Sequence, residues 1–211
     1  MRSQFDKQLA QLHRELIEMG ALCEQVIALS SQALTNRDTA LAEKVAPLDH
    51  EIDRKERDIE NLCLRLLLQQ PPGAAALKMI TDMERIGDQA DDIAEILRCR
   101  AGRPLSAGDT LRDMARATIR MVSESVDAYV RQDVDLAQQV IAADDEVDGY
   151  FDRIKAHLID RIAKAVDDGE ATLDLLMIAK YYERIGDHAT NIAEWVIYSV
   201  TGVHKDEITF T

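Results

Sequence analysis

The sequence is poor in aromatic residues, which make up 4% of its 211 residues, and it has only four prolines and nine glycines. Strands favour aromatic side chains, and the turns between them need proline and glycine. Apolar residues still account for 46% of the chain. The composition therefore favours long helices packed through Leu, Ile, Val and Ala, and the chain is long enough to bury a core.

Positive charge is also in short supply, because 25 Lys and Arg residues face 39 Asp and Glu residues and leave a formal net charge of −14. Binding to nucleic-acid phosphates or to anionic lipid needs a basic surface. The charge balance therefore argues against both of these partners. It permits cations and basic protein partners.

The three cysteines, Cys23, Cys63 and Cys99, include no Cys-x-x-Cys pair. This spacing argues against a zinc knuckle or a redox motif, and we expect small core side chains in a reducing compartment. Nowhere do about 18 uncharged apolar residues follow one another, and the N-terminus lacks an apolar run of signal-peptide length. We therefore expect a soluble, cytoplasmic protein.

One sequence motif occurs twice in the chain, at residues 84–95 and again at residues 183–194. The five letters Glu-Arg-Ile-Gly-Asp are identical in the two copies, at an offset of 99 residues. Upstream, residues 38–53 match residues 133–148 at an offset of 95. A repeat of this length indicates two copies of one supersecondary unit.

Apolar residues recur every three or four positions through most of the chain, which is the helical period. Asp38 is placed to cap the second helix, and Pro47 should kink or restart it because proline lacks a backbone donor. Gly202 should end the last helix. The helices expected are about 3–34, 39–66, from the turn at 70–73 to 100, 111–130, 136–162 and 171–200.

The fold class predicted from these patterns is all-α, with six helices in two tandem antiparallel three-helix bundles. Residues 1–102 form the first repeat, residues 103–107 a linker, residues 108–202 the second repeat and residues 203–211 a tail.

Acidic residues spaced four apart form a stripe along the second and third helix of each half. The two stripes of a half lie at matching distances from the turn between their helices, at residues 70–73 and at residues 167–169, so an antiparallel pair brings them level. The candidate metal ligands are Asp49, Asp53, Glu84, Asp88 and Asp92 in the first half, and Asp144, Asp148, Glu183, Asp187 and Asn191 in the second.

Converging carboxylates need either protons or a bound cation, because like charges raise one another's pKa. An all-oxygen site favours iron, manganese or magnesium, whereas zinc usually takes His or Cys. The alternative is a solvated acidic face, which any single pair of acids would indicate; the verbatim duplication and the matching register favour metal. His188 follows Asp187 directly and points about 100° away, so it is a poor ligand candidate. Gly87 and Gly186 suggest that another backbone passes close by.

No phosphate-binding glycine loop, nucleophile elbow or Cys/His pair occurs, so nothing in the sequence proposes a catalyst. A carboxylate-bridged di-metal oxidase is disfavoured because the chain lacks the Glu-x-x-His pairs of those bundles. We therefore predict that the protein is not an enzyme.

Two copies of Glu-Arg-Ile-Gly-Asp-x-Ala-x-Asp/Asn-Ile-Ala-Glu, each preceded by Asp-x-x-Ile/Val-Asp on the previous helix, resemble the PhoU family of phosphate-specific transport accessory proteins. The resemblance covers nearly the whole chain. It implies two three-helix bundles, metal clusters at the acidic motifs, a homodimer, and negative control of phosphate uptake and phosphate-starvation signalling. Implied partners are the ATPase subunit of the phosphate ABC transporter and a sensor histidine kinase, so that the membrane is reached only through proteins. A metal-responsive scaffold or storage protein is the alternative function.

The first half departs from the family pattern after Pro71. Asp53 and Glu84 are 31 residues apart, whereas Asp148 and Glu183 are 35 apart, so the first hairpin lacks about one helical turn. We expect the second cluster, with the full family spacing, to be the stronger metal site.

Overall fold

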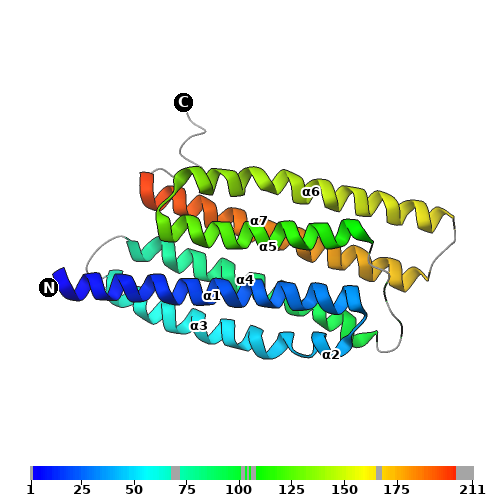
Figure 1. Cartoon of the computed structure of the whole chain (residues 1–211), viewed down its shortest axis with the longest axis horizontal. Helices are drawn as coiled ribbons and strands as arrows, with labels where there is room; N and C mark the ends of the chain where they lie inside the picture. Colours follow the sequence, from blue (N-terminus) through cyan, green and yellow to red (C-terminus); the bar gives the residue numbers. More distant parts are fainter. Residues whose placement is uncertain are drawn as a thin grey trace.

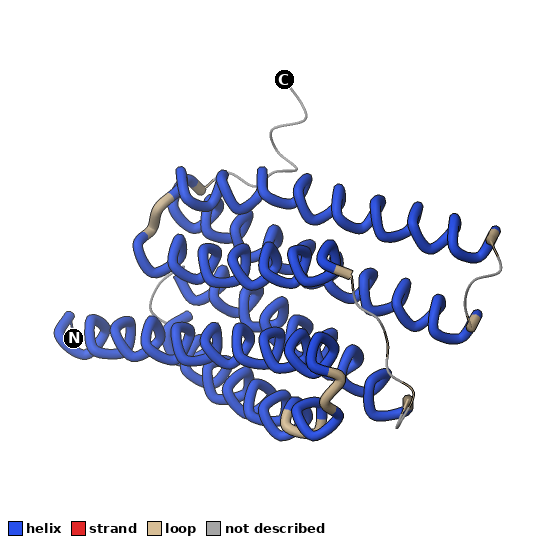
Figure 2. Tube along the Cα trace, turned by 45° about the vertical axis from the view of Figure 1, so that its right-hand side comes forward, coloured by secondary structure: helices blue, strands red, loops and turns tan. Residues whose placement is uncertain are grey.

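The structure, a computed structural model, describes residues 2–67, 72–100, 103, 105, 108–164 and 168–202. Its helices are α1 (Arg2–Asn36), α2 (Thr39–Ala42), α3 (Val45–Leu67), α4 (Pro72–Cys99), α5 (Asp109–Arg131), α6 (Val134–Ala163) and α7 (Gly169–Thr201). Six of these are long and α2 is a single turn; within the described ranges there is no strand (Figure 2). The all-α prediction is confirmed.

The helix ends follow the local chemistry of the sequence. Asp38 caps α2, since its carboxylate accepts a hydrogen bond from the Ala40 N–H. The helix then restarts at Val45 and carries Pro47 in the first turn of α3, where a missing backbone donor costs least. Gly202 ends α7 with φ +73°, a left-handed conformation that glycine adopts without strain. The tail predicted for residues 203–211 lies outside the described residues.

Each half is a three-helix bundle, formed by α1, α3 and α4 in the first half and by α5, α6 and α7 in the second. The halves join through α4 against α7 and α1 against α5, so these four helices form the centre and α3 and α6 lie at opposite edges (Figure 1). The α6–α7 hairpin projects beyond its neighbours in both views. This matches the helix lengths of 30 and 33 residues, against 23 and 28 for α3 and α4.

One hydrophobic core runs through both halves. Its largest fully buried side chains include Leu16 and Ile27 from α1, Ile86 from α4 and Tyr182 from α7. Because the core is continuous, the two repeats pack as one body. None of the described helices is long and apolar enough to cross a bilayer.

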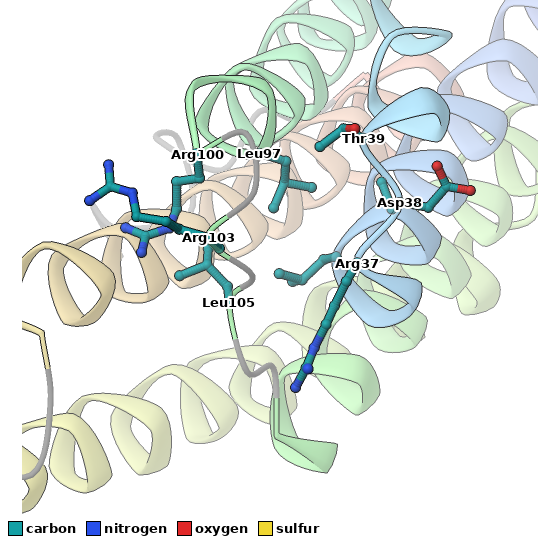
Figure 3. A pocket seen from close by; sticks show the side chains of 9 residues that line it. Arg37, Asp38, Thr39, Leu97, Arg100, Arg103 and Leu105 are labelled. Atoms are coloured by element: carbon teal, nitrogen blue, oxygen red, sulfur yellow. The ribbon is translucent and has the colours of Figure 1, made fainter.

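Two arginines tie the connection between the halves to the start of α7. The buried Arg100 donates to Asp174 at 2.6 Å, and Arg103 reaches both carboxylate oxygens of Glu170 at 2.6 and 3.2 Å. Figure 3 shows both side chains extending away from the apolar side chain of Leu105. The end of α4 is thereby fixed against α7.

Candidate metal centre

The first acidic cluster lies where α3 meets α4. Asp49 and Asp53 come from α3, and Glu84 and Asp88 come level with them from α4, as the register predicts. Asp49 is the most enclosed, with 9% of its surface exposed. Burial raises the pKa of Asp49 to about 6, and the charges of Asp53 and Asp88 add to the increase.

Glu84 and Asp88 of the first cluster are subject to the same two effects. Burial raises the pKa of Glu84 and of Asp88, and the negative charges of neighbouring carboxylates raise both further. The positive charge of Arg85 opposes the rise in both pKa values, but only in part. The cluster is therefore a group of partly buried carboxylates whose charge neighbouring cations balance only in part.

Glu56 also belongs to the first cluster, although the repeat did not point to it. Its pKa is raised by burial, by Glu60 and by Asp53 and Asp88. At the 95-residue offset its counterpart is Phe151, so a search for acids present in both halves passes over it. The signal that could have found it is its position three residues after Asp53, on the same face of α3.

Gly87 creates the space that Asp49 occupies. A Cβ atom at Gly87 would lie 2.7 Å from Asp49 Oδ1 and 3.0 Å from Ile52 Cδ1. The close neighbour is thus a carboxylate side chain and not the backbone that we expected. Asp49 Oδ1 makes no hydrogen bond within the described part of the chain. A buried carboxylate oxygen left without a donor is costly unless a proton or a cation meets it.

The second cluster lies where α6 meets α7 and is more open. Burial raises the pKa of Asp144 to about 6, with further increases from the charges of Asp187 and Asp148. Asp148 and Asp187 are themselves exposed. Glu183 forms an ion pair with Lys180 on its own helix, and Lys180 also counters the rise in the pKa of Asp187. This cluster thus contains a cation of its own.

The equivalent glycine of the second cluster, Gly186, is packed less tightly. A Cβ atom at Gly186 would meet Asp144 Oδ1 and Val147 Cγ1 at 3.4 Å, which is an ordinary van der Waals contact. Space for Asp144 therefore does not depend on Gly186. The backbone approach expected at both glycines is found at neither, and only Gly87 is tightly packed, against side chains.

The last candidate of each stripe lies at the α4–α7 interface. Asn191 donates from Nδ2 to Asp82 Oδ1 at 3.1 Å, and His188 Nδ1 lies 2.9 Å from the same oxygen. Burial raises the pKa of Asp92, Asp88 adds to the rise, and Arg184 of α7 opposes it. The structure thus places Asn191 in a bridge between the halves, and Asp92 between the first cluster and α7.

Asp82 was missed because the 99-residue offset aligns it with Tyr181, which is not an acid. Only the packing of α4 against α7 brings Asp82 to His188. His188 is here a neighbour of the acidic residues, as its place beside Asp187 indicated.

Both clusters lie on the side of the molecule away from α1 and α5. On α3, Lys55 pairs with Glu15 of α1 at 2.6 Å, and Asp53, two residues earlier, points about 200° around the helix. On α6, Glu146 pairs with Arg120 of α5 at 2.6 Å, and Asp148 stands two residues later. The layer formed by α3, α4, α7 and α6 thus carries both clusters on one broad face.

The donor set suits a hard or borderline cation. Every member of the two clusters offers oxygen, and Asp49 Oδ1 lies buried against Gly87 without a hydrogen bond. Among the described residues, no group of three or more His, Cys, Asp or Glu side chains is already arranged as a metal site. Binding in the first cluster would fall to Asp49, Asp53, Glu84 and Asp88, and in the second to Asp144, Asp148, Glu183 and Asp187.

Both halves of the chain match the same known protein-family model. The PhoU domain model matches it twice, over residues 16–97 and 111–196. The chain belongs to the PhoU family. The two matches coincide with the two three-helix bundles, so each bundle is one PhoU domain.

Relatives that match over most of their length belong to the same family. The chain is 34% identical over 214 aligned positions to the phosphate-specific transport system accessory protein PhoU homolog of Clostridium acetobutylicum, covering 97% of this chain and 98% of the relative. It is 30% identical to the phosphate-specific transport system accessory protein PhoU of Escherichia coli, covering 94% and 86%. The crystal structure of PhoU from Pseudomonas aeruginosa superposes with a TM-score of 0.88 at 31% identity, over 94% of this chain and all of that one.

PhoU proteins are non-enzymatic accessory and regulatory helical proteins, and this chain is accordingly not an enzyme. The acidic clusters are therefore candidate binding sites and not catalytic sites.

Proposed function

We propose that this PhoU protein is a metal-binding regulatory adaptor that restrains phosphate uptake and phosphate-starvation signalling. The observation that carries the proposal is the match over nearly the full length to accessory proteins of phosphate-specific transport. The relatives are accessory proteins of phosphate transport, and the proposal adds negative control of uptake and of starvation signalling.

The proposed partners are the ATPase subunit of the phosphate ABC transporter and the sensor histidine kinase of a two-component system. The protein acts in the cytoplasm as a homodimer and reaches the membrane through these partners. The broad face that carries both acidic clusters supports docking, because a net charge of −14 favours partners with a basic surface. Adaptor function also needs no catalytic group.

Bound metal ions would stabilise this face by linking neighbouring helices. Iron, manganese or magnesium would join α3 to α4 through the first cluster and α6 to α7 through the second. A cation there would offset the burial, and the repulsion between carboxylates, that raise the pKa of Asp49 and Asp144. Metal occupancy would thus set the charge and the rigidity of the surface that partners meet.

The test is deletion of the gene, followed by measurement of phosphate uptake and of a phosphate-starvation reporter in phosphate-rich medium. Loss of a restraining adaptor should raise both. Wild-type protein should restore both to low levels, and pull-down with it should recover the ATPase subunit and the kinase.

The variant Asp49→Asn/Asp88→Asn removes two candidate ligands of the first cluster. It tests whether function depends on metal binding and not on the fold alone. The matched control is Asp113→Asn/Asp127→Asn, which removes two exposed carboxylates that pair with arginines on α5. The control should complement the deletion and the cluster variant should not. Unchanged uptake and reporter output after deletion, with neither partner recovered, would leave a metal-responsive scaffold as the function.

A further inference from the structure

Exposed apolar side chains gather at the projecting end of the α6–α7 hairpin (Figure 1). Eight large apolar side chains are exposed in the described part of the chain, and four of them, with 43% to 61% of each exposed, lie here: Ile159, Ile162, Leu173 and Met177. Neighbouring exposed apolar side chains typically mark a surface that another molecule covers, whereas single ones need no explanation. We call these four residues the apolar seam.

The register of the hairpin brings the two helices of the seam together. Lys180 Nζ of α7 lies 5.4 Å from the ring centroid of Phe151 of α6, and nearer the turn Leu158 and Leu175 line the same cavity. Counting from these contacts towards the turn places Ile159 within one residue of the level of Leu173. The seam is therefore one surface with a contribution from each helix.

The seam continues the face that carries the second acidic cluster. Around the axis of α6, Ile159 and Ile162 lie within about 40° of Asp148, and around the axis of α7, Leu173 lies within about 40° of Asp187. This face is turned away from α5, which packs against both helices on their other side. Along the hairpin, the surface thus changes from acidic to apolar towards the turn.

The spacing within the seam suits a helix as its occupant. Ile159 and Ile162 are three residues apart on α6, and Leu173 and Met177 are four apart on α7. Apolar residues at these spacings on two antiparallel helices form a groove that accepts the side chains of a third helix. α5 already packs in this way on the other side of the hairpin.

The seam belongs to the second half alone. At the 99-residue offset, Leu173 and Met177 align with Ala74 and Lys78, so α4 lacks the large apolar pair that α7 provides. The second hairpin is also the longer one, with helices of 30 and 33 residues. The extra length carries the seam to a part of the molecule that the first half does not match.

Negative charge adjoins the seam on the side of the second cluster, where three carboxylates are exposed: Asp148, Asp152 and Asp187. Lys180 is paired with Glu183, and Arg184 acts on Asp92 of α4. Lys155 alone then stands against the three carboxylates. The charge on this side favours an occupant with Lys or Arg at the end that lies over the cluster.

We propose that the apolar seam and the second acidic cluster together dock a basic amphipathic helix of a partner protein, with its apolar stripe on the seam and its basic residues over the carboxylates. A second copy of this chain fits less well, because the contact would bring together the acidic faces of two chains of net charge −14. The same charge opposes anionic lipid. This inference rests on the proposed adaptor role and specifies the surface and the kind of partner element that it uses.

Isothermal titration of the purified full chain with a synthetic helix tests the proposal. The probe is a peptide of about 14 residues with Leu on one stripe and Lys elsewhere. The seam variant is Ile159→Ser/Leu173→Ser. The control, Ile17→Ser/Leu64→Ser, removes two exposed apolar side chains from the first half, and Leu64 aligns with Ile159 at the 95-residue offset.

Wild-type protein and the control should bind the Leu/Lys peptide with equal Kd, and the seam variant at least about tenfold more weakly. Thermal melts by circular dichroism establish that all three proteins are folded. A Leu/Glu peptide with the same apolar stripe should bind wild-type protein at least about tenfold more weakly than the Leu/Lys peptide. Equal binding of the two peptides would overturn the basic character of the partner. No binding of the Leu/Lys peptide, or the same Kd in the seam variant and the control, would overturn the docking site.

Two further measurements examine the other occupants. The seam variant should keep the wild-type mass in sedimentation equilibrium, and wild-type protein should not pellet with phosphatidylcholine vesicles. A lower mass in the variant would assign the seam to a second copy, and pelleting that the variant loses would assign it to a membrane; either result overturns the proposal. These measurements use purified protein, so their failure is distinguishable from failure of the adaptor role, which the gene deletion tests.

Discussion

The two acidic clusters come from nearly the same sequence and meet different surroundings. In the first, Asp49 is buried against Gly87, Glu56 adds a further acid, and the charge is balanced only in part by Arg85. In the second, the outer acids are exposed and Lys180 supplies a positive charge. The comparison teaches that the spacing of ligands along a helix does not determine how strongly a site needs a cation.

This difference bears on which cluster is the stronger metal site. From spacing alone we expected the second, and that expectation stays a prediction. Burial and uncompensated charge in the first cluster argue for the opposite order, since a buried carboxylate group gains most from a cation.

The largest expected effect is on metal content. Asp49→Asn/Asp88→Asn should remove most of the metal carried by the first cluster, because loss of even an outer-shell group costs about 10–100-fold in affinity. Asp144→Asn/Asp187→Asn should remove less. Elemental analysis of proteins purified without chelator measures both. Wild-type metal content in both variants would refute the metal assignment, and a greater loss in the second variant would restore the order expected from spacing.

The two glycines provide the next test. Gly87→Ala should lower the free energy of unfolding by about 1–3 kcal/mol, because the new methyl group would stand 2.7 Å from Asp49 Oδ1 and force it to move. Gly186→Ala should be neutral or raise that free energy by up to about 1 kcal/mol, since alanine favours a helix and meets only ordinary contacts. Urea denaturation of the metal-free proteins gives both values. Equal destabilisation by the two substitutions would contradict the difference in packing.

The pH dependence of the free energy of unfolding tests the contribution of Asp49. Its pKa is about 6 in the folded protein against an ordinary value of 3.8, so between these values the folded state binds more protons than the unfolded state. The contribution of Asp49 therefore lowers the free energy of unfolding as the pH rises from about 4 to 6, and the loss is complete above that window.

Asp49→Asn should accordingly stabilise the metal-free protein at neutral pH by about 1–2 kcal/mol, and the gain should shrink towards pH 4. Denaturation across this pH range measures it. Saturating metal should reverse the sign and make wild-type protein the more stable one, because a cation that binds only the folded state stabilises it. A gain that does not vary with pH would exclude ionisation of Asp49 as its cause.

The smallest effect concerns the cation of the second cluster. Lys180 aligns with Thr81 at the 99-residue offset, so Lys180→Thr gives the second cluster the residue found beside the first. Because Lys180 is partly exposed, its removal should raise the metal affinity of the second cluster only about two- to fivefold. Competition with a metal-sensitive dye measures the change, and Lys164→Thr, which removes an exposed ion pair with Asp160, is the control. An equal rise in the control would assign the effect to net charge.

Most of the fold could be predicted from the sequence because its signals are local or repeated. The helical period, the Asp38 cap, Pro47 and Gly202 place helix ends to within a few residues. The level register of Asp53 with Asp88 follows from their distances to the turn. The shorter first hairpin was also visible in the spacing of the acidic motifs.

The rest of the site depends on contacts between segments that no spacing encodes. Asn191 was expected beside Asp187, but it bonds to Asp82 because α4 of the other half packs against α7. Glu56 was missed because only one repeat carries it. The compression at Gly87 depends on how closely α3 approaches α4, and two identical five-letter phrases cannot reveal that difference.

The pairing of α4 with α7 has a consequence for how such a molecule can diversify. The Glu-Arg-Ile-Gly-Asp copies sit on helices that face each other across the middle of the body, in the way that two separate subunits would meet about a twofold axis. In an assembly of two identical chains, every substitution appears in both subunits. Here the two copies share one polypeptide, so Lys180 and Glu56 could each arise on one side alone. Covalent linkage thus lets the two bundles differ within one chain.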